Sequence, residues 1–155
     1  MIRAEFVRRK LHLIAEDLGR LLHFRDRTLD ELAGDFVAMA AVERLLERVV
    51  MRAIDVNQHL LSELATGCEE KITRFTYRDT FLGLAEIGIY PAEFAEQIAR
   101  SAGLRNILVH DYNDLDRSIV HNSISSCLGD YYRYVEYIAN LLGPPPDNAK
   151  GHRNL

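Results

Sequence analysis

The feature of this sequence that most constrains its fold is a long stripe of apolar residues between Leu32 and Leu64. These residues recur mostly at intervals of three or four, which places their side chains on one face of an α-helix. We expect this helix to run almost to Gly67, with a bend or a division at Gly34. At about 1.5 Å per residue it would be roughly 50 Å long, enough for the spine of a helical bundle. The stripe comprises Leu32, Phe36, Met39, Leu46, Val49, Val50, Ala53, Ile54, Leu60 and Leu64.

The same periodicity predicts four more helices, over residues 2–23, 76–87, 91–111 and 114–142. Thr28 and Glu31 have the spacing of a capping box at the start of the long helix, and Thr76 is a second N-cap candidate. Gly88 can close the helix that begins at Thr76, because glycine readily adopts a left-handed conformation. Five helical segments with short connections, and no convincing alternating strand pattern, predict an all-α, up-and-down bundle of four or five helices.

Composition and charge restrict the class of protein. Of the 155 residues, 48% are hydrophobic and 27% are charged, so we expect one globular domain over residues 1–142. Residues 143–155 are Pro-rich and almost devoid of apolar side chains, and we expect a flexible tail there. Neither a signal peptide nor a run of about 18 apolar residues is found, which predicts a cytoplasmic protein without membrane contact.

The net charge of −4 excludes a global positive field, so any contact with RNA must be local. We expect such a patch to include Arg100, Arg105 and Arg117, with help from residues 8–10. A solvated helix face is the other interpretation of these charges.

Motifs for metal or nucleotide binding are missing from the sequence. The six histidines have neither HxxxH nor HExxH spacing, and Cys68 and Cys127 lie far apart without a CxxC pair. No GxGxxG, GxxxxGK[ST] or GxSxG pattern occurs. We therefore expect no metal site, no cofactor and no disulfide, and we interpret both cysteines as reduced structural thiols.

One segment, Arg105–Tyr112 (RNILVHDY), concentrates polar groups at the end of an otherwise apolar helix. Asn106 and His110 share a helix face, whereas Arg105 and His110 are separated by about 140° around the axis. A guanidinium can bind a phosphate and stabilise charge that develops in phosphoryl transfer. An imidazole with a pKa of about 6.5 can transfer a proton at neutral pH. Together these groups suffice for metal-free RNA cleavage by attack of the ribose 2′-hydroxyl on its own phosphate.

A purely structural interpretation of these residues is also open. Arg105 can pair with Asp79 or Glu86, His110 can cap the C-terminus of a helix, and Tyr112 can close the core with its hydroxyl in water.

Two lesser groups of polar residues have similar alternatives. The group Asp55, Asn57 and His59 either supports a cleft or forms a surface turn of the long helix. Tyr131 and Tyr134 are three residues apart on the last helix, where they either pack in the core or in a dimer interface, or stack on bases of RNA.

The segment Arg105–Tyr112 also resembles the Rx4HxY motif of HepT-like toxins, a branch of the HEPN superfamily of helical ribonucleases. Further similarity lies in residues 41–46, 53–60, 76–81 and 84–89, so the resemblance covers roughly residues 1–142. It implies a HEPN-type bundle that forms a homodimer, in which two such segments face one cleft and make a composite, metal-independent ribonuclease site. Such a dimer would overcome the 140° separation, because the partner supplies the opposing groups.

The resemblance implies a role for each polar residue of the motif. Arg105 would bind and stabilise the scissile phosphate, His110 would act as general acid or base, and Asn106 and Asp111 would support the site. Tyr112 would accept AMP from ATP, transferred by an antitoxin that resembles a minimal nucleotidyltransferase (MNT). The added phosphates would block a site for an anionic substrate by charge and bulk.

The leading hypothesis is therefore the endoribonuclease toxin of a HepT/MNT toxin–antitoxin module. It would cleave mRNA or tRNA, leave 2′,3′-cyclic phosphate ends, and have neither DNA nor a membrane as a partner. The first alternative is a non-catalytic helical subunit that binds a nucleotidyltransferase and offers it a substrate. The second is a dimerisation protein in which Arg105 forms an interchain salt bridge.

Overall fold

A computed structural model describes residues 1–65, 75–108 and 114–147 of the chain. All regular secondary structure in these ranges is helical and no strand is present there, which confirms the predicted all-α class. No helix in these ranges is both long and apolar enough to cross a membrane. The helices are α1 (Ala4–Leu21), the short 3₁₀-helix η1 (Leu22–Phe24), α2 (Leu29–Ala33), α3 (Phe36–Leu64), α5 (Tyr77–Glu86), α6 (Ala92–Ala99), α7 (Ser101–Leu108) and α8 (Asp114–Leu142).

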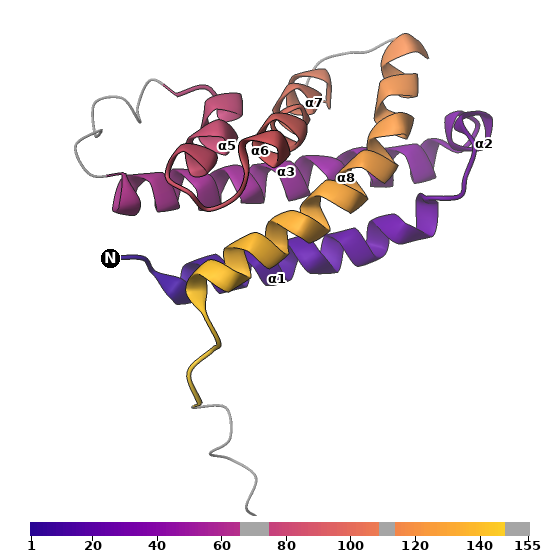
Figure 1. The fold of residues 1–155 in the computed structure, drawn as a ribbon. Coiled ribbons are helices and arrows are strands. Elements are labelled where there is room, and N and C mark those ends of the chain that lie inside the picture. The colour runs from indigo at the N-terminus through magenta and orange to yellow at the C-terminus, as the bar shows by residue number, and fades with distance from the viewer. Residues whose placement is uncertain (66–74, 109–113, 148–155) are drawn as a thin grey trace, which may run out of the picture.

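The long helices α1, α3 and α8 form the body of the bundle (Figure 1). α3 packs against α1 over most of its length, and α8 crosses in front of both helices. The shorter helices α5, α6 and α7 pack on α3 and α8, on the side of α3 that faces away from α1. The C-terminal end of α7 therefore lies at the end of the bundle where α8 begins (Figure 1).

The apolar stripe of α2 and α3 is buried as predicted, except for Phe36 and Leu64. Phe36 is 87% exposed because the long helix is divided at Gly34, as the sequence indicated. Asp35 begins a new helix there, and its carboxylate accepts a hydrogen bond from the Ala38 backbone N–H at 3.0 Å. This second start changes the phase of the helix, so that its first residue faces solvent.

The boundaries predicted from capping residues agree with the structure. Thr28 and Glu31 form a capping box at α2, and Thr76 forms a second one at α5. Gly88 follows α5 with φ of 84°, in the left-handed region that favours glycine. The predicted connection over residues 66–74 lies outside the described residues.

The prediction of one helix over residues 91–111 is wrong, because α6 and α7 are separated at Arg100. At this junction the Arg100 N–H donates to the Gln97 carbonyl oxygen and the Gly103 N–H donates to the Arg100 carbonyl oxygen. These bonds span three residues rather than four, which interrupts the α-helical pattern. Ser101, at the same junction, also contacts α8. A tertiary contact of this kind leaves no trace in the apolar periodicity.

α8 bends in its N-terminal part (Figure 1). There the Ser123 and Ser126 hydroxyls donate to backbone carbonyl oxygens four residues earlier, at 2.7 and 3.2 Å. Such hydroxyl contacts compete for the carbonyl groups of the helix and often bend it. The bend turns the first residues of α8 toward the end of α7 (Figure 1).

Candidate active site

Arg105, the predicted phosphate-binding residue, lies in the last turn of α7. A basic side chain is favoured there because helix carbonyl groups concentrate negative partial charge at the C-terminal end. The start of α7 is anchored by Ser101, whose hydroxyl donates to the Ile98 carbonyl oxygen at 2.6 Å and lies 2.7 Å from the Tyr131 hydroxyl oxygen. Burial raises the pKa of Tyr131 well above its ordinary value, so its hydroxyl stays protonated for this contact.

The Arg105 guanidinium is stacked over the ring of Tyr77, with the guanidinium carbon 5.1 Å from the ring centroid. The negative face of the ring attracts the cation and gives the guanidinium a preferred orientation. The Nε atom of Arg105 is buried and has no hydrogen-bond partner. Buried polar atoms are nearly always paired, and exceptions often accompany a functional role.

The alternative pairing of Arg105 with Asp79 or Glu86 is not formed in the structure, which describes all three residues. The Asp79 carboxylate instead accepts a hydrogen bond from the Thr76 backbone N–H at 3.0 Å. Asp79 therefore stabilises the start of α5, and the cation of Arg105 is not neutralised by it.

Tyr77 occupies the first turn of α5, where the capping box holds the backbone. In addition to the Asp79 contact, the Thr76 hydroxyl accepts from the Asp79 N–H at 3.2 Å. The Thr80 hydroxyl donates to the Tyr77 carbonyl oxygen at 2.7 Å. The backbone at Tyr77 is therefore fixed by its own helix, independently of the contact with Arg105.

A chain of hydrogen bonds in the core connects Thr80 to α3 and α8. Asn57 of α3 is completely buried, and its side-chain nitrogen donates to the Thr80 hydroxyl at 3.2 Å. The Asn57 side-chain oxygen accepts from the Tyr134 hydroxyl at 2.6 Å, and this hydroxyl also lies 3.2 Å from the Ala53 carbonyl oxygen. Because these polar groups satisfy one another inside an apolar core, the chain fixes α3, α5 and α8 relative to one another.

The contact of Tyr77 with Arg105 and the chain of hydrogen bonds beneath it are not predicted by the sequence patterns. The capping pattern at Thr76 was a signal for the position of Tyr77 at a helix start. Nothing in the spacing of these residues indicates that α5 and α7 bring Tyr77 and Arg105 together.

Of the predicted site residues, the structure describes Arg105 and Asn106. Asn106 is exposed and follows Arg105 directly, so the two side chains point in directions about 100° apart on α7. His110, Asp111 and Tyr112 lie outside the described residues, and their predicted roles stay predictions.

The predicted polar group on the long helix is divided between two environments. Asn57 lies in the core, as described above. Asp55 accepts from the Lys10 ammonium at 2.9 Å, and the His59 Nε2 atom accepts from the Arg3 backbone N–H at 3.0 Å. Only Asn57 therefore supports the region of Arg105, whereas the other two attach α1 to α3.

The basic residues expected to form a local patch have different surroundings. Arg100 lines a groove, Arg105 is stacked on Tyr77, and Arg117 acts on Glu43. Burial raises the pKa of Glu43, and the charge of Arg117 partly offsets this effect. These contacts do not test whether the three arginines form one patch, which stays a prediction.

A groove of about 640 Å³ opens between α6, α7 and α8. Leu104 and Ile107 of α7 line it together with Ile119 of α8, which is 40% exposed. These residues belong to the same end of the bundle as Arg105. The groove also contains the charged residues Glu93, Glu96, Arg100 and Asp130, so it presents a surface of mixed character next to the candidate site.

Cys127 also lines this groove, but it is buried, and burial followed by the charge of Asp130 raises its thiol pKa to about 12. A thiol in this state is protonated and a poor nucleophile, which agrees with the structural role predicted for it. Cys68 lies outside the described residues. Within the ranges that the structure describes, no group of three or more His, Cys, Asp or Glu side chains could hold a metal ion.

Residues 14–138 match the model of the family described as Ribonuclease HepT-like. The chain belongs to the HepT-like ribonuclease family. A tRNA nuclease HepT of Aphanizomenon flos-aquae is 38% identical over 133 residues, which are 86% of this chain and 87% of that relative. An mRNA nuclease HepT of Shewanella oneidensis is 28% identical over 104 residues, which are 67% of this chain and 74% of that relative.

Solved structures of toxins have the same fold as this HepT-like chain. A tri-AMPylated HEPN toxin of Shewanella oneidensis, in complex with an MNT antitoxin, matches with a TM-score of 0.72 and 24% identity, over 86% of this chain and 96% of the solved one. A toxin–antitoxin structure with AMP-PNP matches with a TM-score of 0.74 and 24% identity, over 86% and 97% of the two chains. The HEPN-type bundle implied by the motif resemblance is thereby confirmed.

We expect Tyr134→Phe to lower the free energy of unfolding by about 1–3 kcal/mol, because it leaves the buried Asn57 oxygen without its donor. The control is Tyr132→Phe on the same helix, since Tyr132 is 41% exposed and should tolerate the change. Urea denaturation measures both variants. Equal stability of the two would show that the buried chain of hydrogen bonds does not hold α3 and α8 together.

Proposed function

We propose that this HepT-like chain is an endoribonuclease toxin that cleaves tRNA or mRNA in the cytoplasm without a metal ion or cofactor. The observation that carries the proposal is the Arg105 guanidinium, stacked over Tyr77 and not engaged in an ion pair with any residue of the described ranges. A cation held in this way is oriented in advance for an anionic group. Family membership supports the choice of RNA, since the relatives above are named as tRNA and mRNA nucleases.

In the proposed reaction, the ribose 2′-oxygen attacks the adjacent phosphorus, and the bond between phosphorus and the 5′-oxygen of the next nucleotide breaks. His110 removes the proton of the 2′-hydroxyl or donates a proton to the leaving 5′-oxygen. Arg105 binds the non-bridging oxygens and stabilises the charge that develops on them. Asn106 and Asp111 support these groups. The products are a 2′,3′-cyclic phosphate and a 5′-hydroxyl.

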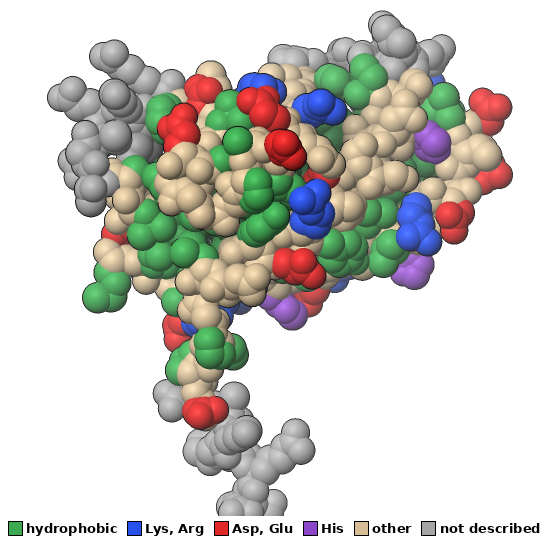
Figure 2. All heavy atoms as spheres, viewed as in Figure 1, with side chains coloured by type: hydrophobic (Ala, Val, Ile, Leu, Met, Phe, Trp, Pro, Cys, Tyr) green, Lys and Arg blue, Asp and Glu red, His purple; other side chains and the backbone are tan. Residues whose placement is uncertain are grey.

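We place this site in the cleft of a homodimer. Arg105 and His110 are separated by about 140° on a regular helix, so groups from two copies complete the site more readily than groups from one. The groove between α6, α7 and α8, in which Ile107 and Ile119 lie among charged and polar side chains, offers a surface for the second copy beside Arg105. The face in Figure 2 exposes hydrophobic side chains between scattered charged ones, which is compatible with such an interface.

We propose that an MNT nucleotidyltransferase is the antitoxin of this chain and that it transfers AMP from ATP to Tyr112. The solved toxins of the same fold support this partner, because one of them is tri-AMPylated and bound to an MNT antitoxin, and another belongs to a toxin–antitoxin structure with AMP-PNP. Each phosphate added beside Arg105 and His110 would compete with the phosphate of the RNA.

The first test is cleavage of total RNA and of tRNA by wild-type protein and His110→Ala in excess EDTA. We expect the wild type to produce 2′,3′-cyclic phosphate ends and His110→Ala to lose activity by roughly 10²–10⁴-fold, because the proton-transfer group is gone. His12→Ala is the control, since His12 is exposed and contacts Glu16 on the same helix. A folded His110→Ala protein with wild-type activity would refute the assigned role. Absence of cleavage by an unmodified, folded wild-type dimer would favour the non-catalytic subunit instead.

The contact between Arg105 and Tyr77 gives a second test. Tyr77→Leu removes the aromatic face under the guanidinium, and we expect kcat to fall by about tenfold because Arg105 is no longer oriented. Tyr77→Phe keeps the ring and should retain most of the activity. Both variants keep the Thr76 capping box, and circular dichroism checks their folding. Equal kcat values for the two variants would exclude orientation by the ring.

AMP transfer is tested separately, by intact-mass measurement after incubation with the antitoxin and ATP. We expect added multiples of the AMP residue mass in the wild type and none in Tyr112→Phe, because the acceptor hydroxyl is missing. Modification of Tyr112→Phe to the wild-type extent would place the acceptor elsewhere, without affecting the ribonuclease proposal.

A further inference from the structure

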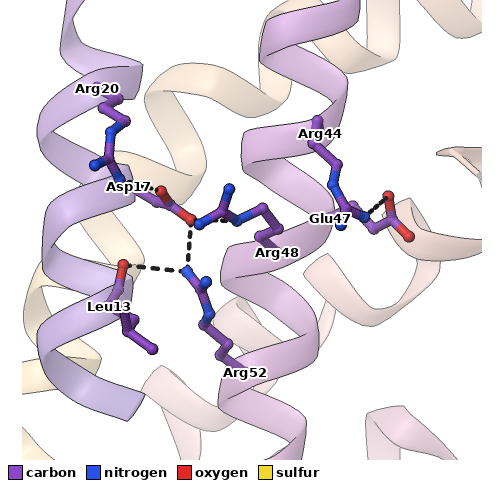
Figure 3. A network of polar contacts seen from close by, with 7 residues as sticks. All are labelled: Leu13, Asp17, Arg20, Arg44, Glu47, Arg48 and Arg52. Carbon is purple, nitrogen blue, oxygen red and sulfur yellow. Dashed lines mark hydrogen bonds and ion pairs between the residues drawn. The ribbon is translucent and has the colours of Figure 1, made fainter. Parts of the chain in front are cut away.

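Three arginines converge on one buried carboxylate between α1 and α3 (Figure 3). Asp17 of α1 is completely buried, and its Oδ1 atom accepts from Arg20 Nη1 at 2.7 Å. Its Oδ2 atom lies 3.0 Å from Arg48 Nε and 2.6 Å from Arg52 Nη1, both on α3. We call Arg20, Arg48 and Arg52 the arginine cluster.

The arginine cluster carries more positive charge than its carboxylate neutralises. Three guanidinium groups against one carboxylate leave a formal charge of +2, in a chain whose net charge is −4. Arg48 and Arg52 share a single oxygen, so two cations are held close together and repel each other. Arg44, one turn earlier on α3, is paired with Glu47 at 3.2 Å and adds no surplus charge (Figure 3).

The three arginines have different exposures, which divides their roles. The Arg52 side chain is 17% exposed and also donates to the Leu13 carbonyl oxygen at 3.3 Å, so it joins α3 to α1. The Arg20 and Arg48 side chains are 56% and 37% exposed. Each of these two is held to Asp17 through one nitrogen, while part of its guanidinium faces solvent. A guanidinium anchored at one edge loses little further freedom when it binds an anion at the other.

We propose that Arg20 and Arg48 bind the phosphodiester backbone of RNA, as a contact separate from the Arg105 site. This inference rests on the proposed function, because it concerns the same RNA. The rigid fork of a guanidinium matches the oxygens of a phosphate, and a backbone phosphate supplies the charge that the arginine cluster lacks. A locally positive surface is also what an acidic chain needs in order to hold a polyanion.

The position of the arginine cluster separates its role from catalysis. α1 and α7 pack on different sides of α3, so the cluster lies across α3 from Arg105 (Figure 1). We therefore expect Arg20 and Arg48 to affect the affinity for RNA and KM, and not kcat at saturating RNA.

The test measures binding of unfractionated tRNA by the full-length chain in the His110→Ala background, which prevents cleavage. We expect Arg20→Gln with Arg48→Gln to weaken binding by roughly tenfold at low salt and to reduce the slope of log K against log salt by roughly 1–2, as for the loss of two phosphate contacts. The control is Arg25→Gln with Arg44→Gln, which removes the same charge from two exposed arginines that have their own carboxylate partners. The control should retain the wild-type affinity and slope.

Urea denaturation checks the folding of the double variant, in which the Arg52–Asp17 contact is retained. If the double variant unfolds, Arg20→Gln alone provides the test, with an expected reduction of the slope by about 1.

An unchanged slope, an equal effect in the control, or a loss of antitoxin binding without loss of tRNA binding would overturn the inference. Cleavage of RNA by the wild type, together with unchanged RNA binding by the double variant, would refute only the RNA-binding role of Arg20 and Arg48. Binding through the cluster without any cleavage would refute only the proposed function.

Discussion

The hydrogen bonds that join Tyr134, Asn57 and Thr80 are the interaction on which the candidate site depends. They connect α8, α3 and α5 inside the core, where an unpaired polar group would cost much of the stability of a small domain. The geometry of the core is therefore specified more sharply than apolar packing alone would require. Thr80 extends the chain to the backbone of Tyr77, and the ring of Tyr77 orients Arg105. A buried network in the bundle thus determines the direction of a cation at its surface.

The two polar networks of this protein serve different purposes. The Asn57 chain is neutral and its named groups pair with one another, so it positions helices without leaving a charge to be satisfied. The contacts of Asp17 join α1 to α3 but leave an excess of positive charge at the surface. The same physical rule, that buried polar groups need partners, accounts for both networks. Only the second has charge left over for a ligand.

Much of the bundle could be predicted because local rules and the tertiary structure agree. Thr28, Thr76 and Gly88 mark helix ends through their own backbone conformation and contacts. The apolar stripe of α3 is buried because its side chains leave water when they pack against the neighbouring helices. The division between α6 and α7 could not be predicted, since it involves a contact of Ser101 with Tyr131, thirty residues away. Phe36 is exposed for a related reason, because Asp35 starts a new helix and changes its phase.

The sequence by itself determined the helical class, most helix ends, the family, and the position of Arg105 in a motif that resembles those of HepT-like ribonucleases. These properties depend on residues that are close together in the chain, where periodicity and capping act directly. The tertiary structure alone decided that Tyr77 lies beneath Arg105, that Asn57 is in the core while Asp55 and His59 attach α1, and that three arginines surround Asp17. Each of these contacts joins different helices, and the sequence does not show which faces of two helices will meet.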